Sequence, residues 1–152
     1  MYNQFSPDEA FYQGDILVDT PCFVDREDRN EAEIENASIK RLSVMILSQT
    51  CDILRKKFVI IAPVVTVQDL QETGVVNADQ IRSLKKQDIK YWFYLPAHED
   101  FPDSYVEFTK ITHTSISNLI KNKRMKSLSD LGRHWLSYKV SDFFGRPFNR
   151  QI

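Results

Sequence analysis

Short apolar segments separated by polar turns recur along the chain, and this pattern predicts a mainly β fold. Each segment is rich in Val, Ile, Leu or aromatic residues, a composition typical of strands. The near-continuous apolar run of 41–49 indicates a central strand that is buried on both faces or lies where a barrel closes. The six predicted strands are 15–19, 41–49, 58–65, 91–95, 105–109 and 111–115.

Prolines and charged residues set the expected limits of these strands. Pro21 is expected to close the first strand. Pro63 has no backbone donor, so the third strand is expected to bend, bulge or turn outward there. The acidic stretch 25–38 is too long for a hairpin turn and too charged for a core, so we expect an exposed loop.

The stretch 67–89 departs from the strand pattern and predicts helices. Its apolar residues recur at loosely helical spacing, and Gly74 and Asn77 divide it into two short helices. It is therefore expected to be a helical insertion between strands.

A helix over 129–144 is the clearest single prediction. Ser129 is a good N-cap, and Asp130 suits the positive end of the helix dipole. Gly145 suits the C′ position, and Pro147 prevents continuation. The apolar face that should pack across the sheet comprises Leu131, Trp135, Tyr138, Val140, Phe143 and Phe144.

These elements predict a strongly bent, mostly antiparallel barrel of five to six strands with the C-terminal helix against it. Replacing Trp135 by Ala is expected to cost about 3–5 kcal/mol, as for other buried large aromatic residues. The predicted core comprises Ile16, Val18, Val44, Ile46, Val59, Ile61, Phe93, Val106, Trp135 and Phe143.

Length and composition predict one domain, 1–152, in the cytoplasm. The start lacks a secretory signal, no apolar run approaches the roughly 18 residues of a membrane span, and two cysteines cannot form a disulfide framework. Net charge is −1, but residues 25–35 carry six acids against two bases, and residues 121–150 carry eight bases against two acids. These are either solvated surfaces or a basic face for an anionic partner with an acidic loop guarding it.

Reactive and polar side chains follow the central strand, where turn residues would be ordinary. Cys51 is either a small buried residue or a nucleophile. A metal set of Cys51, Asp52, His98 and His113 is a weaker alternative, because no pair has the usual ligand spacing. The run itself is Ser48, Gln49, Thr50, Cys51 and Asp52.

Other polar and aromatic groups leave alternatives open. The hydroxyls of Ser48 and Thr50 either bind a ligand or phosphate or cap the following turn. The aromatic run 91–94 supplies either a stacking platform for bases or a core face and an interface. The common nucleotide-binding and hydrolase motifs are absent from the sequence.

The order of elements resembles the PemK/MazF family of small toxin barrels. The resemblance is carried by a Gly-Asp-Ile opening at 14–16, a basic-start strand at 40–48 and a Pro-containing strand at 59–64. The last feature is the stretch 124–129, in which basic residues are followed by Leu-Ser just before the last helix. The resemblance covers most of the chain except the lead-in and 67–89.

This resemblance implies an SH3-like barrel and, in most members, a dimeric endoribonuclease held in a toxin–antitoxin pair. Such enzymes need no metal: a 2′-hydroxyl attacks the neighbouring phosphate, aided by an Arg and an acid–base partner. By position, Arg41 would be the basic residue, Ser48 or Thr50 the hydroxyl, and Glu107 the acidic stand-in. The Arg-Pro usual at the strand start is Arg41-Leu42 here.

Two functions therefore stay open. The first is a non-catalytic barrel that binds a protein or nucleic-acid partner in a bacterial or phage-linked accessory or defence system. Its binding residues would be Gln49, Cys51, Asp52, Arg26 and Arg29. The second is a metal-independent endoribonuclease that cleaves single-stranded RNA through Arg41, Ser48, Thr50 and Glu107. Neither requires a cofactor; RNA, a protein partner or antitoxin, and a second copy are the expected partners.

Overall fold

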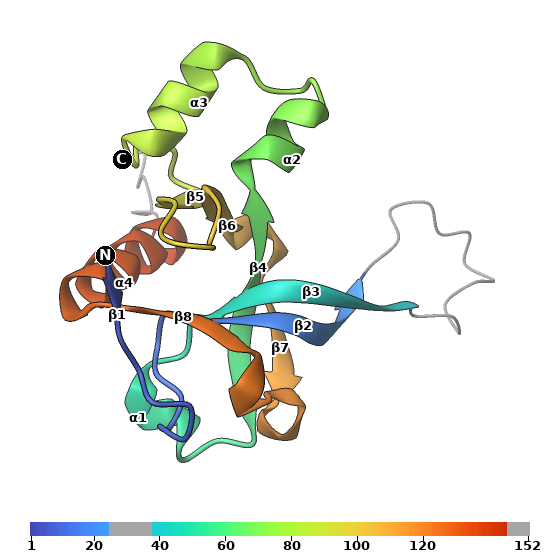
Figure 1. Cartoon of the computed structure of the whole chain (residues 1–152), viewed down its shortest axis with the longest axis vertical. Coiled ribbons are helices and arrows are strands. Elements are labelled where there is room, and N and C mark those ends of the chain that lie inside the picture. Colours follow the sequence, from blue (N-terminus) through green and yellow to red (C-terminus); the bar gives the residue numbers. More distant parts are fainter. Residues whose placement is uncertain (25–37, 146–152) are drawn as a thin grey trace, which may run out of the picture.

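A computed structural model describes residues 1–24 and 38–145, and this part of the chain is mainly β with four α-helices (Figure 1). None of the described helices is long and apolar enough to cross a membrane. The strands are β1 (Tyr2–Asn3), β2 (Asp15–Val24), β3 (Ser38–Ile46), β4 (Phe58–Thr66), β5 (Trp92–Leu95), β6 (Ser104–Glu107), β7 (Thr112–Ser115) and β8 (Arg124–Leu128). The helices are α1 (Thr50–Ile53), α2 (Val67–Glu72), α3 (Ala78–Lys85) and α4 (Asp130–Phe144), with 3₁₀ turns η2 (Phe108–Lys110), η3 (Ile116–Asn118) and η4 (Lys121–Lys123).

The strands form one antiparallel sheet that curls into a half-barrel. Their order is β1-β8-β2-β3-β4-β6-β5, and β7 pairs with β4 beside this path. Helix α4 lies at one end of the curl, and α2 and α3 project together from the end of β4 (Figure 1). The predicted fold class, a bent antiparallel sheet with a helical insertion and a C-terminal helix, is thus confirmed.

Strand β2 does not end at Pro21, contrary to the sequence-based expectation. The strand continues to Val24, and Pro21 lies opposite Arg41 in the ladder with β3. A register shift lies between Leu17 and Thr20, and Asp19 there has φ of 50°. An irregularity of this kind turns the strand before Pro21, so the proline is accommodated within the strand.

Pro63 marks the point where β4 changes its outer neighbour. Residues 58–61 pair with β7, whereas residues 64–66 pair with β6. Pro63 itself lies opposite Val44 of β3. The change of neighbour agrees with the irregularity expected of a residue that has no backbone donor.

The helical insertion is confirmed, and local capping explains it. Asn77 and Gln80 form a reciprocal capping box at the start of α3, with both hydrogen bonds at 2.9 Å. Thr66 caps α2 by accepting a hydrogen bond from the Asp69 amide. The two helices share a small core of their own, formed by Val67, Leu70, Ile81, Leu84 and Tyr105.

Helix α4 begins as predicted but faces the sheet differently. Ser129 caps it by accepting a hydrogen bond from the Gly132 amide, and Gly145 is the C-cap at φ −86° rather than a left-handed C′ residue. The buried helix positions are Gly132, Leu136 and Lys139. A Cβ at residue 132 would lie 3.0 Å from the Met1 carbonyl oxygen, so the glycine permits this close approach.

The prediction that Trp135 belongs to the core is therefore wrong. Its side chain is 49% exposed, whereas Leu136 is fully buried. The helix is rotated by about one residue from the expected face, so its Leu, Trp and Tyr stripe faces solvent. Val18 and Phe143 are half-buried, and the confirmed core residues are Ile16, Val44, Ile46, Val59, Ile61, Phe93 and Val106.

Two substitutions test the rotation of α4. Leu136→Ala should lower the free energy of unfolding by about 2–5 kcal/mol, because it leaves a cavity in the core. Trp135→Ala should cost clearly less, since half of that side chain already contacts solvent. Urea unfolding followed by circular dichroism measures both. Equal losses, or a larger loss for Trp135→Ala, would contradict this orientation.

Candidate functional site

The run after the central strand is held mainly by backbone contacts. Strand β3 ends at Ile46, so Ser48 and Thr50 lie beyond it rather than within it. The Ser48 hydroxyl accepts a hydrogen bond from the Ile60 amide at 2.7 Å, and the Thr50 hydroxyl accepts one from the Gln13 amide at 3.1 Å. Both hydroxyls therefore anchor backbone amides of distant segments, and neither caps the following turn, because α1 has no side-chain cap hydrogen bond.

The remaining members of the run lie in and beside α1. Cys51 is exposed, so the interpretation of a buried, space-filling cysteine is wrong; Cys22 is the buried one. The Cys51 sulfur lies 3.9 Å from the Gln49 side-chain oxygen, and the Asp52 carboxylate lies 3.9 Å from the Lys56 ammonium. No histidine or basic group within the described residues bonds to the thiol.

Arg41 lies on the ribbon formed by β2 and β3. Its guanidinium is 3.6 Å from the Asp19 carboxylate and donates a hydrogen bond to the Asp19 carbonyl at 3.3 Å. Lys123 reaches the same carboxylate at 3.1 Å. The Lys123 hydrogen bond and the two positive charges hold the pKa of Asp19 below its usual value. Arg41 therefore shares a surface ion-pair cluster.

Glu107 lies at the end of β6, opposite Trp92 of β5. Its carboxylate accepts a hydrogen bond from Thr109 at 3.1 Å and lies 3.7 Å from the Lys110 ammonium. Across residues 1–24 and 38–145, no hydrogen bond or ion pair joins any two of the four candidate catalytic side chains. These are Arg41, Ser48, Thr50 and Glu107.

The candidate metal ligands do not converge either. Within the described ranges, no three His, Cys, Asp or Glu residues are placed to hold a metal ion. His98 lies in the turn between β5 and β6, and His113 lies on β7 against the Phe58 ring. Arg26 and Arg29, proposed above as binding residues, lie outside the described residues.

A buried ion pair that the sequence did not reveal ties the N-terminal segment to the sheet. The Arg124 guanidinium lies 2.8 Å from the Asp15 carboxylate, and both side chains are fully buried. Ser127 donates a second hydrogen bond to this carboxylate at 2.6 Å, while Arg124 also donates to the Glu9 and Ala10 carbonyls. The only sequence signal was an Asp at the start of a strand, and its partner lies 109 residues away.

The basic excess near the C-terminus is largely neutralised within the fold. Lys123 pairs with Asp19, and Lys126 lies 2.8 Å from Glu99, which holds the pKa of that carboxyl below its usual value. The buried Lys139 ammonium donates to the carbonyls of residues 87 and 89, and its desolvation lowers its pKa. Arg124 and Arg133 pair with Asp15 and Asp130 respectively. Residues 121–145, the described part of this stretch, therefore present no broad basic face.

The aromatic side chains of strand β5 are also engaged in contacts within the fold. The Trp92 ring packs on Tyr105 with a centroid separation of 4.9 Å, and the Tyr94 hydroxyl donates to the Asp103 carboxylate at 2.6 Å. The Gln87 side chain bonds both the amide and the carbonyl of Tyr94, which covers this edge of the sheet. The aromatic run therefore serves the core and the edge rather than a stacking platform.

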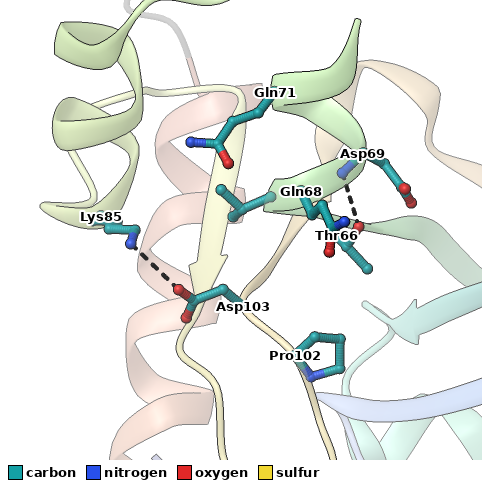
Figure 2. Close-up of a pocket in the computed structure, with 8 residues that line it drawn as sticks. Thr66, Gln68, Asp69, Gln71, Lys85, Pro102 and Asp103 are labelled. Carbon is teal, nitrogen blue, oxygen red and sulfur yellow. Dashed lines mark hydrogen bonds and ion pairs between the residues drawn. The ribbon is translucent and has the colours of Figure 1, made fainter.

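A polar hollow of about 460 Å³ lies where α2, the end of α3 and the loop before β6 meet (Figure 2). Lys85 and Asp103 face each other across it at 3.3 Å. Asp103 also accepts hydrogen bonds from Tyr94 and from the Ala97 amide. The ion pair between Lys85 and Asp103 helps to hold the insertion in place, whereas the Asp69 carboxylate, which also lines the hollow, has no ion pair within the described residues.

A second, mostly apolar groove of about 300 Å³ runs beside the first half of α4. Leu131 and Trp135 from the helix line it, together with Met1 and Gln87. Leu131 and Tyr138 are each 67% exposed, so the outward stripe of α4 continues past the groove. Exposed apolar side chains gathered in this way are typical of protein interaction surfaces.

Comparison with known proteins adds no family assignment. The chain matches no protein-family model and no curated protein sequence.

Asp103 provides a test of the polar hollow. The hydrogen bond from Tyr94, together with the Ala97 amide and Lys85, holds the pKa of Asp103 below its usual 3.8. The ionised carboxylate thus stabilises the fold fully above the unfolded-state pKa, and this contribution is lost as the pH falls through the lower folded-state pKa. Asp103→Asn should reduce the drop in urea midpoint between about pH 5 and pH 2. If the drop in urea midpoint were unchanged in Asp103→Asn, the bonds from Tyr94, the Ala97 amide and Lys85 to the Asp103 carboxylate would not contribute to stability.

Proposed function

We propose that the chain is a non-catalytic, PemK/MazF-like half-barrel that binds a protein partner. The observation that carries this proposal is the state of the candidate catalytic groups. Ser48 and Thr50 bond to backbone amides, while Arg41 and Glu107 belong to separate surface ion pairs. A toxin-type ribonuclease needs an Arg, a hydroxyl and an acid–base group within hydrogen-bond reach of one phosphate position.

The charge distribution favours a protein over a nucleic acid as the partner. Binding to a phosphate backbone depends on Lys and Arg residues that are free to neutralise phosphates. Here Lys123, Arg124, Lys126 and Arg133 are paired with acidic groups, and Lys139 is buried. Net charge is −1, so no global attraction to an anionic polymer replaces them.

The exposed apolar stripe of α4 supports a protein partner. Leu131, Trp135 and Tyr138 lie on one side of the helix and stay exposed while its other side packs on the sheet. Aromatic residues of this kind are enriched at protein interfaces and often carry most of the binding energy. On this proposal the partner is an antitoxin-like or other accessory protein in the cytoplasm, and a second copy of the chain is one form of it.

A capture experiment that compares wild type with a double variant of the α4 stripe tests the proposal. The variant Leu131→Ser/Tyr138→Ser should retain the fold, because both side chains already face solvent. It should weaken partner binding by at least about thirtyfold if the stripe contains hot-spot residues. Immobilised wild type and variant are compared on lysate from the cells that express the protein, with binding of each captured protein quantified.

Val75→Ser is the matched control, since Val75 is 79% exposed but lies between α2 and α3, away from α4. It should capture the same proteins as wild type. Equal capture by wild type and by Leu131→Ser/Tyr138→Ser would contradict a partner surface on α4.

A further inference from the structure

Strand β7 has an open edge with unpaired backbone groups. The Ile116 amide donates to the Lys57 carbonyl, which makes residues 57 and 116 a hydrogen-bonded pair in the register of β4 and β7. Because such pairs alternate along an antiparallel ladder, His113 and Ser115 direct their N–H and C=O groups away from β4. Within the described ranges, no hydrogen bond reaches the N–H or C=O of His113 or the N–H of Ser115, whereas the Ser115 carbonyl lies at the N-cap of η3 and is directed to that turn.

The arrangement of β4 agrees with this assignment. The Ile60 amide donates to Ser48, and its carbonyl accepts from the Leu47 amide, so both groups face the side opposite β7. His113, which lies opposite Ile60, therefore has no ladder bond to β4. Its backbone groups are left for a neighbour on the outer side.

An exposed apolar face adjoins this edge. Phe58 is 57% exposed and Ile60 is 46% exposed, and both lie on the same face because they are two residues apart in β4. The His113 and Ser115 side chains share that face, since they lie opposite Ile60 and Phe58. The Phe58 and His113 rings meet edge to face at 5.6 Å, and the small Ser115 leaves Phe58 open toward the edge.

The charges around this edge are basic. Lys57 directly precedes Phe58, and Arg55 lies two residues before Lys57. Neither forms an ion pair with any residue in the described ranges. Lys110 lies near the other end of β7, where it approaches Glu107 at 3.7 Å. A strand that pairs here is favoured by acidic residues at its two ends.

We propose that an extended, acidic segment of the partner protein pairs with β7 and adds a strand to the sheet. The inference rests on the proposed function, since it names the chemistry of the partner. Backbone pairing to His113 and Ser115 supplies affinity, and alternate apolar side chains cover Phe58 and Ile60. A second copy of β7 fits less well, because its own Lys57 and Lys110 would approach the same bases.

Ser115→Pro blocks the edge without disturbing the fold. Ser115 has φ of −66° and ψ of 141°, which proline adopts without strain. Its N–H points away from β4, so the β4–β7 ladder keeps its bonds. Ser115→Ala is the matched control, because it also loses the hydroxyl bond to Ser117 but keeps the backbone donor. Both variants should unfold at the wild-type urea midpoint.

The probe is a fluorescently labelled octapeptide that alternates valine and glutamate, titrated with each protein by anisotropy. Wild type and Ser115→Ala should bind it with equal affinity. Ser115→Pro should bind at least about tenfold more weakly, through the lost hydrogen bond and the added ring. A peptide that alternates valine and lysine should not bind wild type.

Absence of binding to wild type, equal binding to folded Ser115→Pro, or preference for the lysine peptide would each overturn the inference. A wild-type dimer in light scattering that Ser115→Pro converts to a monomer would also overturn it, in favour of a second copy. The α4 capture experiment does not involve this edge. Loss of peptide binding with intact α4-dependent capture therefore rejects the strand addition alone, whereas failure of capture rejects the proposed function.

Discussion

The buried ion pair between Asp15 and Arg124 is the constraint on which the arrangement of the half-barrel depends. Both side chains are fully removed from solvent, and an unpaired charge at such a depth would cost several kcal/mol. The carboxylate receives further hydrogen bonds from Ser127 and the Tyr12 amide, and the guanidinium lies over the rings of Phe5 and Phe11. One interaction thus joins the N-terminal segment, the start of β2 and the start of β8.

The same network extends to α4 and to the run after β3. Arg133 donates to the Ser127 hydroxyl and to the Gln13 carbonyl, and Gln13 in turn bonds to Thr50 and Leu47. Polar groups that looked reactive in the sequence are therefore the ones that connect the elements. Through Gln13, the network links Thr50 after β3 to the N-terminal segment and to α4.

Local signals were sufficient for much of the fold. The caps at Asn77 and Ser129 depend on residues a few positions apart; the Ser129 cap was predicted, and Asn77 was expected to separate the two helices of the insertion. The rotation of α4 was not predicted, because Trp135 and Leu136 are adjacent and both apolar, and the close approach of Gly132 to Met1 that accompanies the burial of Leu136 joins residues far apart in the sequence. Pro21 was read as a strand end because the irregularity at Asp19 that accommodates it has no sequence signature.

The candidate site was harder to predict because it depends on contacts between distant residues. The run containing Cys51 was correctly placed at a strand end, but the exposure of its thiol follows from the short helix α1, which the sequence only suggested. The sequence could not show that basic residues near the C-terminus are paired, because their acidic partners Asp15, Asp19 and Glu99 lie far away along the chain. The open edge of β7 depends on the order of strands, which no local pattern contains.

The most direct test of the central claim, a binding fold without catalysis, is incubation of the purified protein with a mixture of structured and unstructured RNA. The reaction is run with and without EDTA, beside an Arg41→Ala variant, and the fragments are mapped. The account predicts intact RNA in every lane. Discrete, EDTA-resistant cleavage that disappears in Arg41→Ala would contradict it and establish a ribonuclease of the toxin type.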